Sequence, residues 1–155
     1  MKFIRKSIAI RAVEFGKNVT VIDPVNLYEC KIGDNSFIGP FTEIGRGAII
    51  GKNCRIQSHA YICEMVTIGD NCFISHGVKF INDPFYLGGP AGGDKNLWRP
   101  TNIGCGVSIG TNATILPVSI AGGIIIGAGS VVTKDMTDMG IYAGNPARKI
   151  RDLGC

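Results

Sequence analysis

The fold is decided by residues 31–78, which read KIGDNSFIGPFTEIGRGAIIGKNCRIQSHAYICEMVTIGDNCFISHGV. An isoleucine recurs here every six residues; glycine usually follows it, and a small residue comes four positions after it. A short period sustained over many repeats predicts a solenoid, in which each coil of backbone packs only against the coils above and below it. Working outward, the hexads extend from Phe15 to about Val131 with one interruption.

The composition of the hexad predicts a filled interior. Large residues pointing inward alternate with small ones, so a narrow prism is packed without voids or overpacking. Branched Ile and Val also suit short strands. We expect no interior space for a ligand. The small inward positions are occupied by Ser36, Thr42, Ala48, Cys54, Ala60, Val66, Cys72, Val78, Val107 and Ala113.

Grouping the leading residues in threes predicts a prism with three flat faces and about six coils. At a strand spacing of about 4.8 Å, it would be about 30 Å long. One face should carry the coil leads Phe15, Ile32, Ile50, Ile68, Ile103 and Ile120. A second should carry Val21, Ile38, Ile56, Ile74, Ile109 and Ile126, and the third Leu27, Ile44, Ile62, Phe80, Ile115 and Val132.

Composition predicts a single domain over residues 1–155, with the β-helix at 15–137. The 155 residues include 22 glycines and have a mean hydropathy of +0.22, outside the range of disordered chains, and no Pro/Ser-rich linker divides them. The start at residues 1–6 lacks the apolar core of a signal peptide, and no apolar run is long enough to span a membrane. We expect a cytoplasmic protein without a membrane partner.

The six cysteines are expected to be reduced. Cys54 and Cys72 fall at the small inward position one coil apart, where a thiol acts as a compact apolar residue. The chain has no paired C-x-x-C of the kind that binds zinc, and disulfides are rare in the cytosol. We predict no metal.

Two segments depart from the repeat. An insertion near 86–102 contains the only tryptophan, Trp98, beside Arg99. Long loops in regular folds are usually functional, so we expect a lid or a subunit-contact arm, the alternative being a solvated loop with Trp98 against the prism. After the last hexad, Asn145 is a good N-cap and Pro146 a good first helical residue. This predicts a short helix at 145–153 that covers the last coil.

Nearly the whole chain resembles the hexapeptide-repeat acyltransferases. The resemblance is carried by the hexads and by the segments ILPVS (115–119), IGAGSVVTKD (126–135) and YAGNPAR (142–148). It implies a left-handed parallel β-helix, since the hexad spacing does not choose a hand. It also implies a homotrimer that uses acetyl-CoA or another acyl-CoA in a cleft between neighbouring prisms.

Within that superfamily, FISHGVKFIND (73–83) resembles the nucleotide-sugar N-acetyltransferases. These acetylate the 3-amino group of dTDP- or UDP-linked deoxyamino sugars for surface polysaccharides. The resemblance implies that Asn82 and Asp83 contact the sugar amine. The alternative is structural: an Asx turn that starts the loop before Pro84.

Histidines supply the other candidate groups. His76 should point outward and act as a general base or as a hydrogen-bond partner of acceptor or thioester, the alternative being an uninvolved surface histidine. His59 lies outward one coil earlier, near Gly77, and Glu64 should stack below Asn82. Both are candidates for substrate binding, although many relatives carry another residue in place of His59.

The coenzyme is expected on the late coils, by the same resemblance. Gly127, Ala128 and Gly129 leave an edge poor in side chains for pantetheine. Lys134, Arg148 and Lys149 are placed to attract its phosphates, the alternative being solvated surface charges. The net charge of +4 suits polyanionic ligands, and no array of aromatic and basic residues indicates nucleic-acid binding.

The predicted activity is therefore acetyl-CoA-dependent N-acetylation of a nucleotide-linked amino sugar. A neutral amine needs positioning and oxyanion stabilisation rather than a strong base. An alcohol acceptor would need a base, so the alternative is an O-acetyltransferase on a sugar or amino acid that uses His76. A non-enzymatic assembly subunit like the carbonic-anhydrase-like β-helices is a third hypothesis. A zinc site of that kind needs three imidazoles, and this chain has two histidines.

Overall fold

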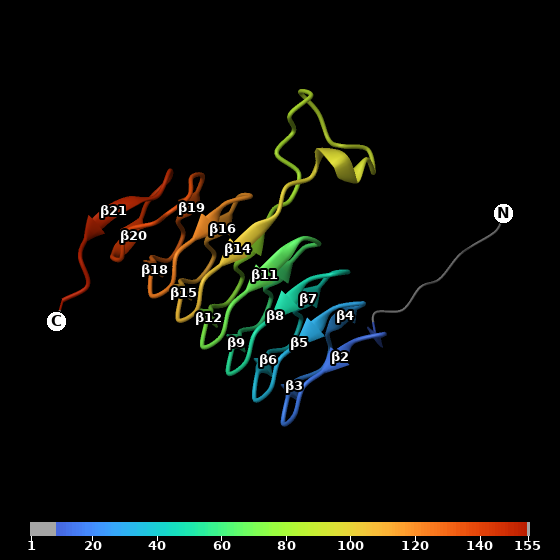
Figure 1. Ribbon diagram of the computed structural model, residues 1–155. Helices are drawn as coiled ribbons and strands as arrows, with labels where there is room; N and C mark the ends of the chain where they lie inside the picture. Colours follow the sequence, from blue (N-terminus) through green and yellow to red (C-terminus); the bar gives the residue numbers. More distant parts are fainter. Residues whose placement is uncertain (1–8, 155) are drawn as a thin grey trace.

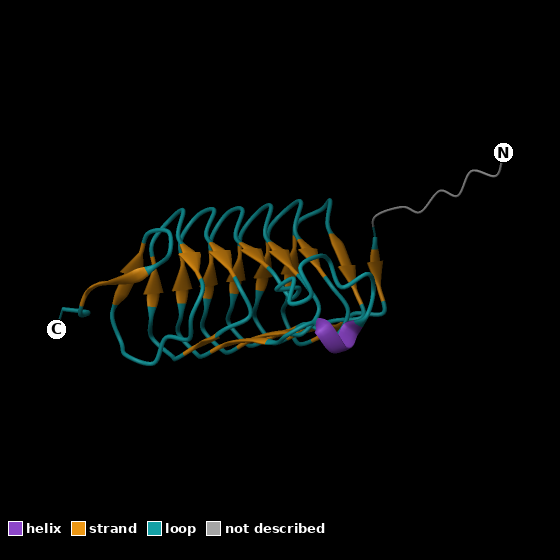
Figure 2. Cartoon of the chain, turned by 90° about the horizontal axis from the view of Figure 1, so that it is seen from above, coloured by secondary structure: helices purple, strands orange, loops and turns teal. Residues whose placement is uncertain are grey.

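The computed structural model describes residues 9–154, and nearly all of its regular structure is short strands stacked in register (Figure 1). Viewed from above, the strands form parallel rows along one axis, joined by repeated turns (Figure 2). They belong to three sheets, and every pair is parallel except the last. This is the predicted left-handed parallel β-helix.

The three sheets are the three predicted faces of the prism. Each coil contributes one strand to each face in turn. The first face contains β2 (Glu14–Phe15), β5 (Lys31–Ile32), β8 (Ile49–Ile50), β11 (Val66–Ile68), β14 (Thr101–Ile103) and β17 (Ser119–Ile120). The second contains β3 (Thr20–Val21), β6 (Phe37–Ile38), β9 (Arg55–Ile56), β12 (Phe73–Ile74), β15 (Ser108–Ile109), β18 (Ile125–Ile126), β20 (Ile141–Ala143) and β21 (Arg148–Arg151).

The third face contains β1 (Ile10–Arg11), β4 (Asn26–Tyr28), β7 (Glu43–Ile44), β10 (Tyr61–Ile62), β13 (Lys79–Phe80), β16 (Thr114–Ile115) and β19 (Val131–Val132). Residues 14–132 therefore make six complete coils, in agreement with the prediction of about six. The first strand starts at Ile10, five residues before the expected beginning at residue 15.

The interior is filled as the hexads predict. The leads from Leu27 to Val132 that were assigned to the three faces are buried, and so are all ten predicted small positions. The buried hydroxyls are satisfied: Ser36 Oγ donates to the Gly51 carbonyl at 2.9 Å and Ser130 Oγ to the Gly127 carbonyl at 2.7 Å. Within residues 9–154, no buried side-chain nitrogen or oxygen lacks a hydrogen-bond partner.

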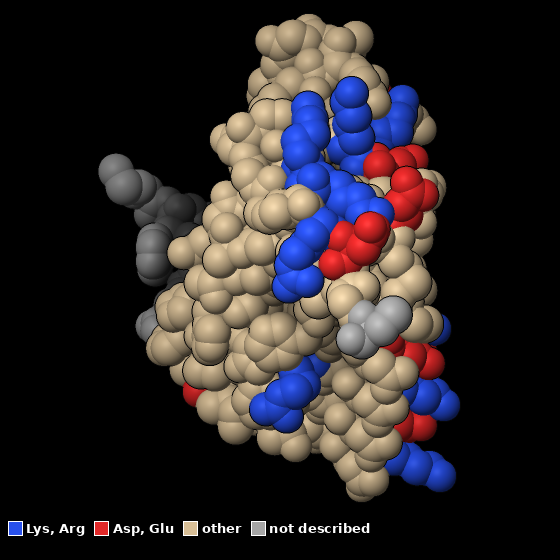
Figure 3. Space-filling model, turned by 90° about the vertical axis from the view of Figure 1, so that its left-hand side faces the viewer, with Lys and Arg blue, Asp and Glu red and all other residues tan. Residues whose placement is uncertain are grey.

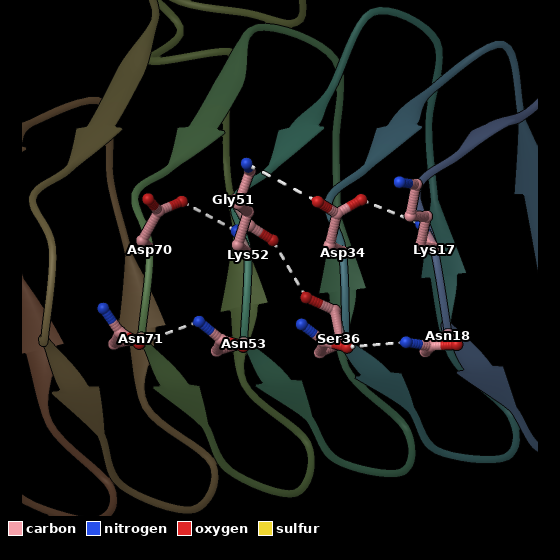
Figure 4. Close-up of polar contacts among 10 residues, drawn as sticks. Lys17, Asn18, Asp34, Ser36, Gly51, Lys52, Asn53, Asp70 and Asn71 are labelled. Carbon is pink, nitrogen blue, oxygen red and sulfur yellow. Dashed lines mark hydrogen bonds and ion pairs between the residues drawn. The ribbon is translucent and has the colours of Figure 1, made fainter.

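The corner between the first and second faces shows how identical positions stack (Figure 4). Asp34 Oδ1 accepts the Lys17 N–H at 2.8 Å, and Asp70 Oδ1 accepts the Lys52 N–H at 2.7 Å. Lys52 Nζ lies 3.5 Å from Asp34, so charges alternate along this edge. The backbone hydrogen bond from Lys17 holds the pKa of Asp34 below its usual value.

The insertion leaves the prism between β13 and β14 and stands away from the coils (Figure 1). It occupies residues 81–100 and contains one turn of 3₁₀ helix, η1 (Lys95–Leu97). Thr101 and Asn102, which were predicted in the loop, belong to β14, where they pair with Val66 and Thr67 of β11.

The predicted helix at 145–153 is wrong. The chain turns back after β20, and β21 pairs with it antiparallel, Tyr142 opposite Lys149 and Ala143 opposite Arg148. A helix this short is marginal unless an apolar face packs, and Ile150 is 63% exposed. Strand pairing instead provides hydrogen-bond partners for backbone groups of β20. The free edge of the sheet therefore determines the structure here, although the local sequence favours a helix start.

Gly33, at the corner between the first and second faces, tests how closely the coils approach. A Cβ on Gly33 would lie 2.7 Å from the Gly51 carbonyl carbon in the next coil, whereas a Cβ on Gly89 in the loop meets nothing within 4 Å. Gly33→Ala should reduce the free energy of unfolding by about 2 kcal/mol and lower the thermal midpoint by about 5 °C. Gly89→Ala should unfold like the wild type. Equal midpoints for the two variants would contradict the close coil contact.

Candidate functional site

The structure places the predicted catalytic residues at two different corners of the prism. His59 and His76 lie between the second and third faces, at the histidine corner (residues 40–41, 58–59, 76–77 and 111–112). Glu64, Asn82 and Asp83 lie between the third and first faces, at the loop corner (residues 29–30, 46–47, 64–65 and 82–83). A full strand of the third face, β10 or β13, separates the two groups within one chain.

At the histidine corner, His76 is exposed and contacts the coil below. Its Nδ1 lies 2.8 Å from Ser58 Oγ, and its carbonyl accepts the Asn112 N–H at 2.9 Å. Gly77 follows with φ +69°, and the Asn112 side chain occupies the space that a Cβ at Gly77 would need. Among the described residues, the ring is thus held at one nitrogen only.

His59 is also exposed, but its surroundings differ. Its ring stacks on Phe41, with centroids 4.9 Å apart and planes at 16°, and its backbone has φ +62°. Lys79 Nζ donates to its carbonyl. Ser58 was not predicted as a site residue. The signal that would have found it is the eighteen-residue offset that places it directly below His76.

At the loop corner, Asn82 stacks over Glu64 as predicted. Asn82 Nδ2 donates to the Glu64 carbonyl at 3.3 Å, while the Glu64 carboxylate binds Lys95 Nζ at 2.5 Å. Glu64 is therefore committed to an ion pair that ties the insertion to the third coil. Asn82 retains its amide oxygen for other partners, since no bond to it is found among residues 9–154.

Asp83 forms the Asx turn that was the structural alternative. Its Oδ1 accepts the Phe85 N–H at 3.0 Å, and its Oδ2 accepts the Ala91 N–H at 2.7 Å. Both carboxylate oxygens therefore organise the base of the insertion. Each still has a second lone pair, which leaves acceptor capacity for a ligand.

The rest of the insertion is internally braced around an apolar tip. The Arg99 N–H donates to the Asn82 carbonyl at 2.9 Å, which closes the base of the loop, and its guanidinium lies over the Tyr86 ring at 5.1 Å. Trp98 is half-buried, with Lys95 Nζ 5.3 Å from its ring. The residues after the Asx turn stay exposed, 58% at Phe85 and 78% at Leu87.

The predicted coenzyme residues gather at the C-terminal end of the prism. Lys134, Arg148 and Lys149 line one pocket of about 240 Å³, together with Tyr142 and Met136. Seen from this end, Lys and Arg side chains form a patch with acidic side chains at its margin (Figure 3). One acidic partner is Asp152, which lies 2.6 Å from Lys149 Nζ and raises the pKa of that amine.

The predicted glycine edge is linked to this pocket through the backbone of Tyr142. The Gly127 N–H donates to the Tyr142 carbonyl at 2.7 Å, and Gly129 turns the corner with φ +68°. Ala128 and Gly129 are exposed, so a ligand that leaves the basic pocket along this edge meets mainly backbone.

The described cysteines are all free thiols. Cys30, Cys54, Cys63 and Cys72 are buried and Cys105 is exposed. Burial raises the pKa of Cys30 to about 11 and that of Cys63 to about 12, so both are unreactive thiols at neutral pH. Between residues 9 and 154, no cluster of three potential metal ligands is found, and no helix is long and apolar enough to cross a membrane. The signal-peptide expectation concerns residues 1–6, which lie outside the described part.

Two family models match the coils. The model described as bacterial transferase hexapeptide (six repeats) matches residues 29–64, and the model of the hexapeptide repeat of succinyl-transferase matches residues 100–134. The coils of this chain are therefore hexapeptide repeats of the bacterial transferase type, and the chain is similar to the acyltransferases built from them.

Solved and curated relatives extend this result over the chain. The structure of AntD, an N-acyltransferase from Bacillus cereus in complex with dTDP and coenzyme A, superposes with a TM-score of 0.79. It is 26% identical, over 92% of this chain and 84% of that one. The galactoside O-acetyltransferase of Escherichia coli K12 is 33% identical over 129 residues, covering 79% of this chain and 63% of that protein.

The bifunctional protein GlmU of Synechococcus sp. RCC307 is 29% identical over 153 residues, covering 92% of this chain. The chain spans only about a third of that relative's length, 33%. The superfamily therefore contains relatives that differ in acceptor and in domain content.

The Asx turn at Asp83 predicts the stability of the insertion. Asp83→Ala should free the Phe85 and Ala91 amides, so that hydrogen exchange at both accelerates about tenfold and trypsin cleaves faster after Lys95. Asp138→Ala, which removes an exposed carboxylate outside the loop, should leave both readouts unchanged. Unaltered exchange in Asp83→Ala would show that the carboxylate does not hold the loop.

Proposed function

We propose that this protein transfers an acetyl group from acetyl-CoA to the 3-amino group of a dTDP- or UDP-linked deoxyamino sugar, in surface polysaccharide biosynthesis. The observation that carries the proposal is the likeness to AntD over 92% of the chain, because that protein is an N-acyltransferase bound to dTDP and coenzyme A. The free thiols fit a cytoplasmic reaction.

In the proposed reaction the neutral amine attacks the thioester carbonyl. An N–C bond forms, the C–S bond breaks, and the amine proton passes to the leaving thiolate. The protein has to position the amine and stabilise the oxyanion. Asn82 offers a free amide oxygen to the amine, and Asp83, fixed by its two backbone hydrogen bonds, offers its remaining lone pairs.

The position of His76 favours an amine over a hydroxyl acceptor. A histidine that acts as a strong base is usually oriented by a carboxylate or a carbonyl at its other nitrogen. Here that partner is the Ser58 hydroxyl, which does not stabilise an imidazolium by charge. We assign His76 a hydrogen bond to the acceptor or the thioester, and His59 and Glu64 a supporting place beside the acceptor.

A homotrimer is part of the proposal, because the two corners cannot meet within one chain. His76 and Asn82 lie in the same coil, at the two ends of the third-face strand β13. Copies related by rotation about an axis parallel to the prism would bring the histidine corner of one to the loop corner of the next at the same height. Such a heterologous contact closes into a ring.

Coenzyme A would enter at the C-terminal pocket. We place its phosphates on Lys134, Arg148 and Lys149 and its pantetheine along Gly127, Ala128 and Gly129. Guanidinium and ammonium groups bind phosphate through charge-assisted hydrogen bonds, and an edge without side chains lets the pantetheine amides reach backbone groups.

An O-acetyltransferase is the second candidate. It is favoured by the 33% identity to the galactoside O-acetyltransferase and by the exposed His76, which would then remove the hydroxyl proton. Under that mechanism His76 becomes the most sensitive residue of the site. The variants Asn82→Ala and His76→Ala therefore distinguish the two functions.

The first test incubates the purified protein with acetyl-CoA and a panel of dTDP- and UDP-linked 3-amino and 4-amino sugars and hydroxyl acceptors, with products detected by mass spectrometry. We expect one acetyl group on a 3-amino sugar. Asn82→Ala should lower kcat about 100-fold, and His76→Ala about tenfold or less. Acetylation confined to hydroxyl acceptors, abolished by His76→Ala, would establish the second candidate instead.

The basic pocket predicts how the coenzyme is held. Arg148→Ala and Lys134→Ala should each raise the KM for acetyl-CoA about tenfold and leave the KM of the acceptor unchanged. Lys31→Ala is the matched control, since it removes one exposed positive charge from the opposite end of the prism. An equal effect of all three variants would mean that only the net charge matters.

A further inference from the structure

Ser58 and His76 occupy the same position in successive coils of the histidine corner. The backbone fixes both: the Gly77 N–H donates to the Ser58 carbonyl at 2.9 Å, and the Asn112 N–H donates to the His76 carbonyl at 2.9 Å. The 2.8 Å contact between Ser58 Oγ and His76 Nδ1 is the only side-chain hydrogen bond of this ring found among residues 9–154. The orientation of the imidazole therefore depends on one hydroxyl.

A hydroxyl at Nδ1 differs chemically from a carboxylate at that atom. A carboxylate only accepts, so it fixes the proton on Nδ1 and makes Nε2 an acceptor. The Ser58 hydroxyl both donates and accepts, so by rotating it satisfies Nδ1 with or without a proton. In one tautomer Nε2 accepts a hydrogen bond, and in the other it donates one.

We propose that Ser58 is a positioning residue for His76: its hydroxyl fixes the imidazole through Nδ1 while leaving both neutral tautomers available at Nε2. The proposal rests on the proposed function, because it gives His76 its place in the acyl-transfer site. Nε2 can then accept from the acceptor amine before attack. In the other tautomer, in which Ser58 donates to Nδ1, Nε2 can instead donate to the carbonyl oxygen of the thioester. Each tautomer is a separate bound state of the neutral ring, so no proton has to cross the ring during the reaction.

The experiment compares Ser58→Ala, Ser58→Thr and the control Ser108→Ala in the full-length protein. Ser108 lies on the second face, in the strand before the histidine corner, and no hydrogen bond of its hydroxyl is found among residues 9–154. Acetyl transfer is measured as kcat and KM, and the tautomer of His76 is read from the ¹⁵N chemical shifts of its ring. The chain has two histidines, so a His59→Gln background assigns the His76 signals.

We expect Ser58→Ala to lower kcat about threefold, less than His76→Ala, because Ser58 acts only through that ring. Both KM values should stay within about twofold, and the Nδ1 shift should change. Ser58→Thr should restore kcat and shifts, because it keeps the hydroxyl. Ser108→Ala should match the wild type.

Two results would overturn the proposal. One is an unchanged ¹⁵N spectrum and kcat in Ser58→Ala. The other is a loss of kcat that Ser58→Thr does not restore in a protein with a wild-type melting temperature, since that loss would come from packing. If the wild type acetylates no acceptor, the proposed function fails; the ¹⁵N comparison still decides whether Ser58 holds the ring.

Discussion

The structure depends on one constraint, the in-register parallel hydrogen bonding between successive coils. The Gly33 N–H bonds to the Ile50 carbonyl at 2.8 Å and the Gly51 N–H to the Ile68 carbonyl at 2.8 Å, and the same pattern recurs along the prism. Because equivalent positions then lie about 4.8 Å apart, the side chains in the neighbouring coils restrict the size and polarity of the residue at each position. Inside, this demands one large and one small residue per hexad. At the corners it allows ladders of like residues, such as Asn53 and Asn71 (Figure 4). It also determines where changes of sequence are tolerated, because only the corners and the insertion lie outside the strands that must stay in register.

The same constraint explains what sequence alone could predict. The three faces follow from the period, because shifting the register by one residue would expose every isoleucine, and the assignment from Phe15 to Val132 agrees with the sheets. The C-terminal hairpin could not be predicted in this way. Asn145 and Pro146 signal a helix start locally, but the free edge of β20 is a tertiary feature that no window of sequence contains. The period also predicted that Glu64 lies below Asn82. It could not predict that the Asp83 carboxylate binds Phe85 and Ala91, since the path of residues 84–100 has no repeat.

The candidate site follows from geometry as much as from residue type. A straight prism presents flat faces whose outward side chains diverge, so convergent groups are found where the backbone turns or leaves the coil. In this chain those places are the histidine corner, with Ser58 and His76, and the loop corner, with Asn82 and Asp83. They share a coil but lie on opposite edges of the third face. A second copy is thus a geometric requirement for any mechanism that uses both, whereas a mechanism confined to one corner needs a single chain.

Acceptor chemistry in such a scaffold is set by few residues. The coils of this chain resemble those of an N-acyltransferase and of a galactoside O-acetyltransferase, so the repeat itself does not distinguish an amine from a hydroxyl. A hydroxyl acceptor needs a base, whereas a neutral amine does not. Whether a histidine can act as that base depends on the group that hydrogen-bonds to its other ring nitrogen. A carboxylate partner would stabilise the imidazolium that forms when a hydroxyl is deprotonated, whereas the Ser58 hydroxyl stabilises neutral imidazole in either tautomer. The coil that carries Ser58 therefore bears on the acceptor as directly as the coil that carries His76. Under the proposed mechanism, the choice between an amine and a hydroxyl depends on the contact between Ser58 and His76, which occupy the same corner in successive coils.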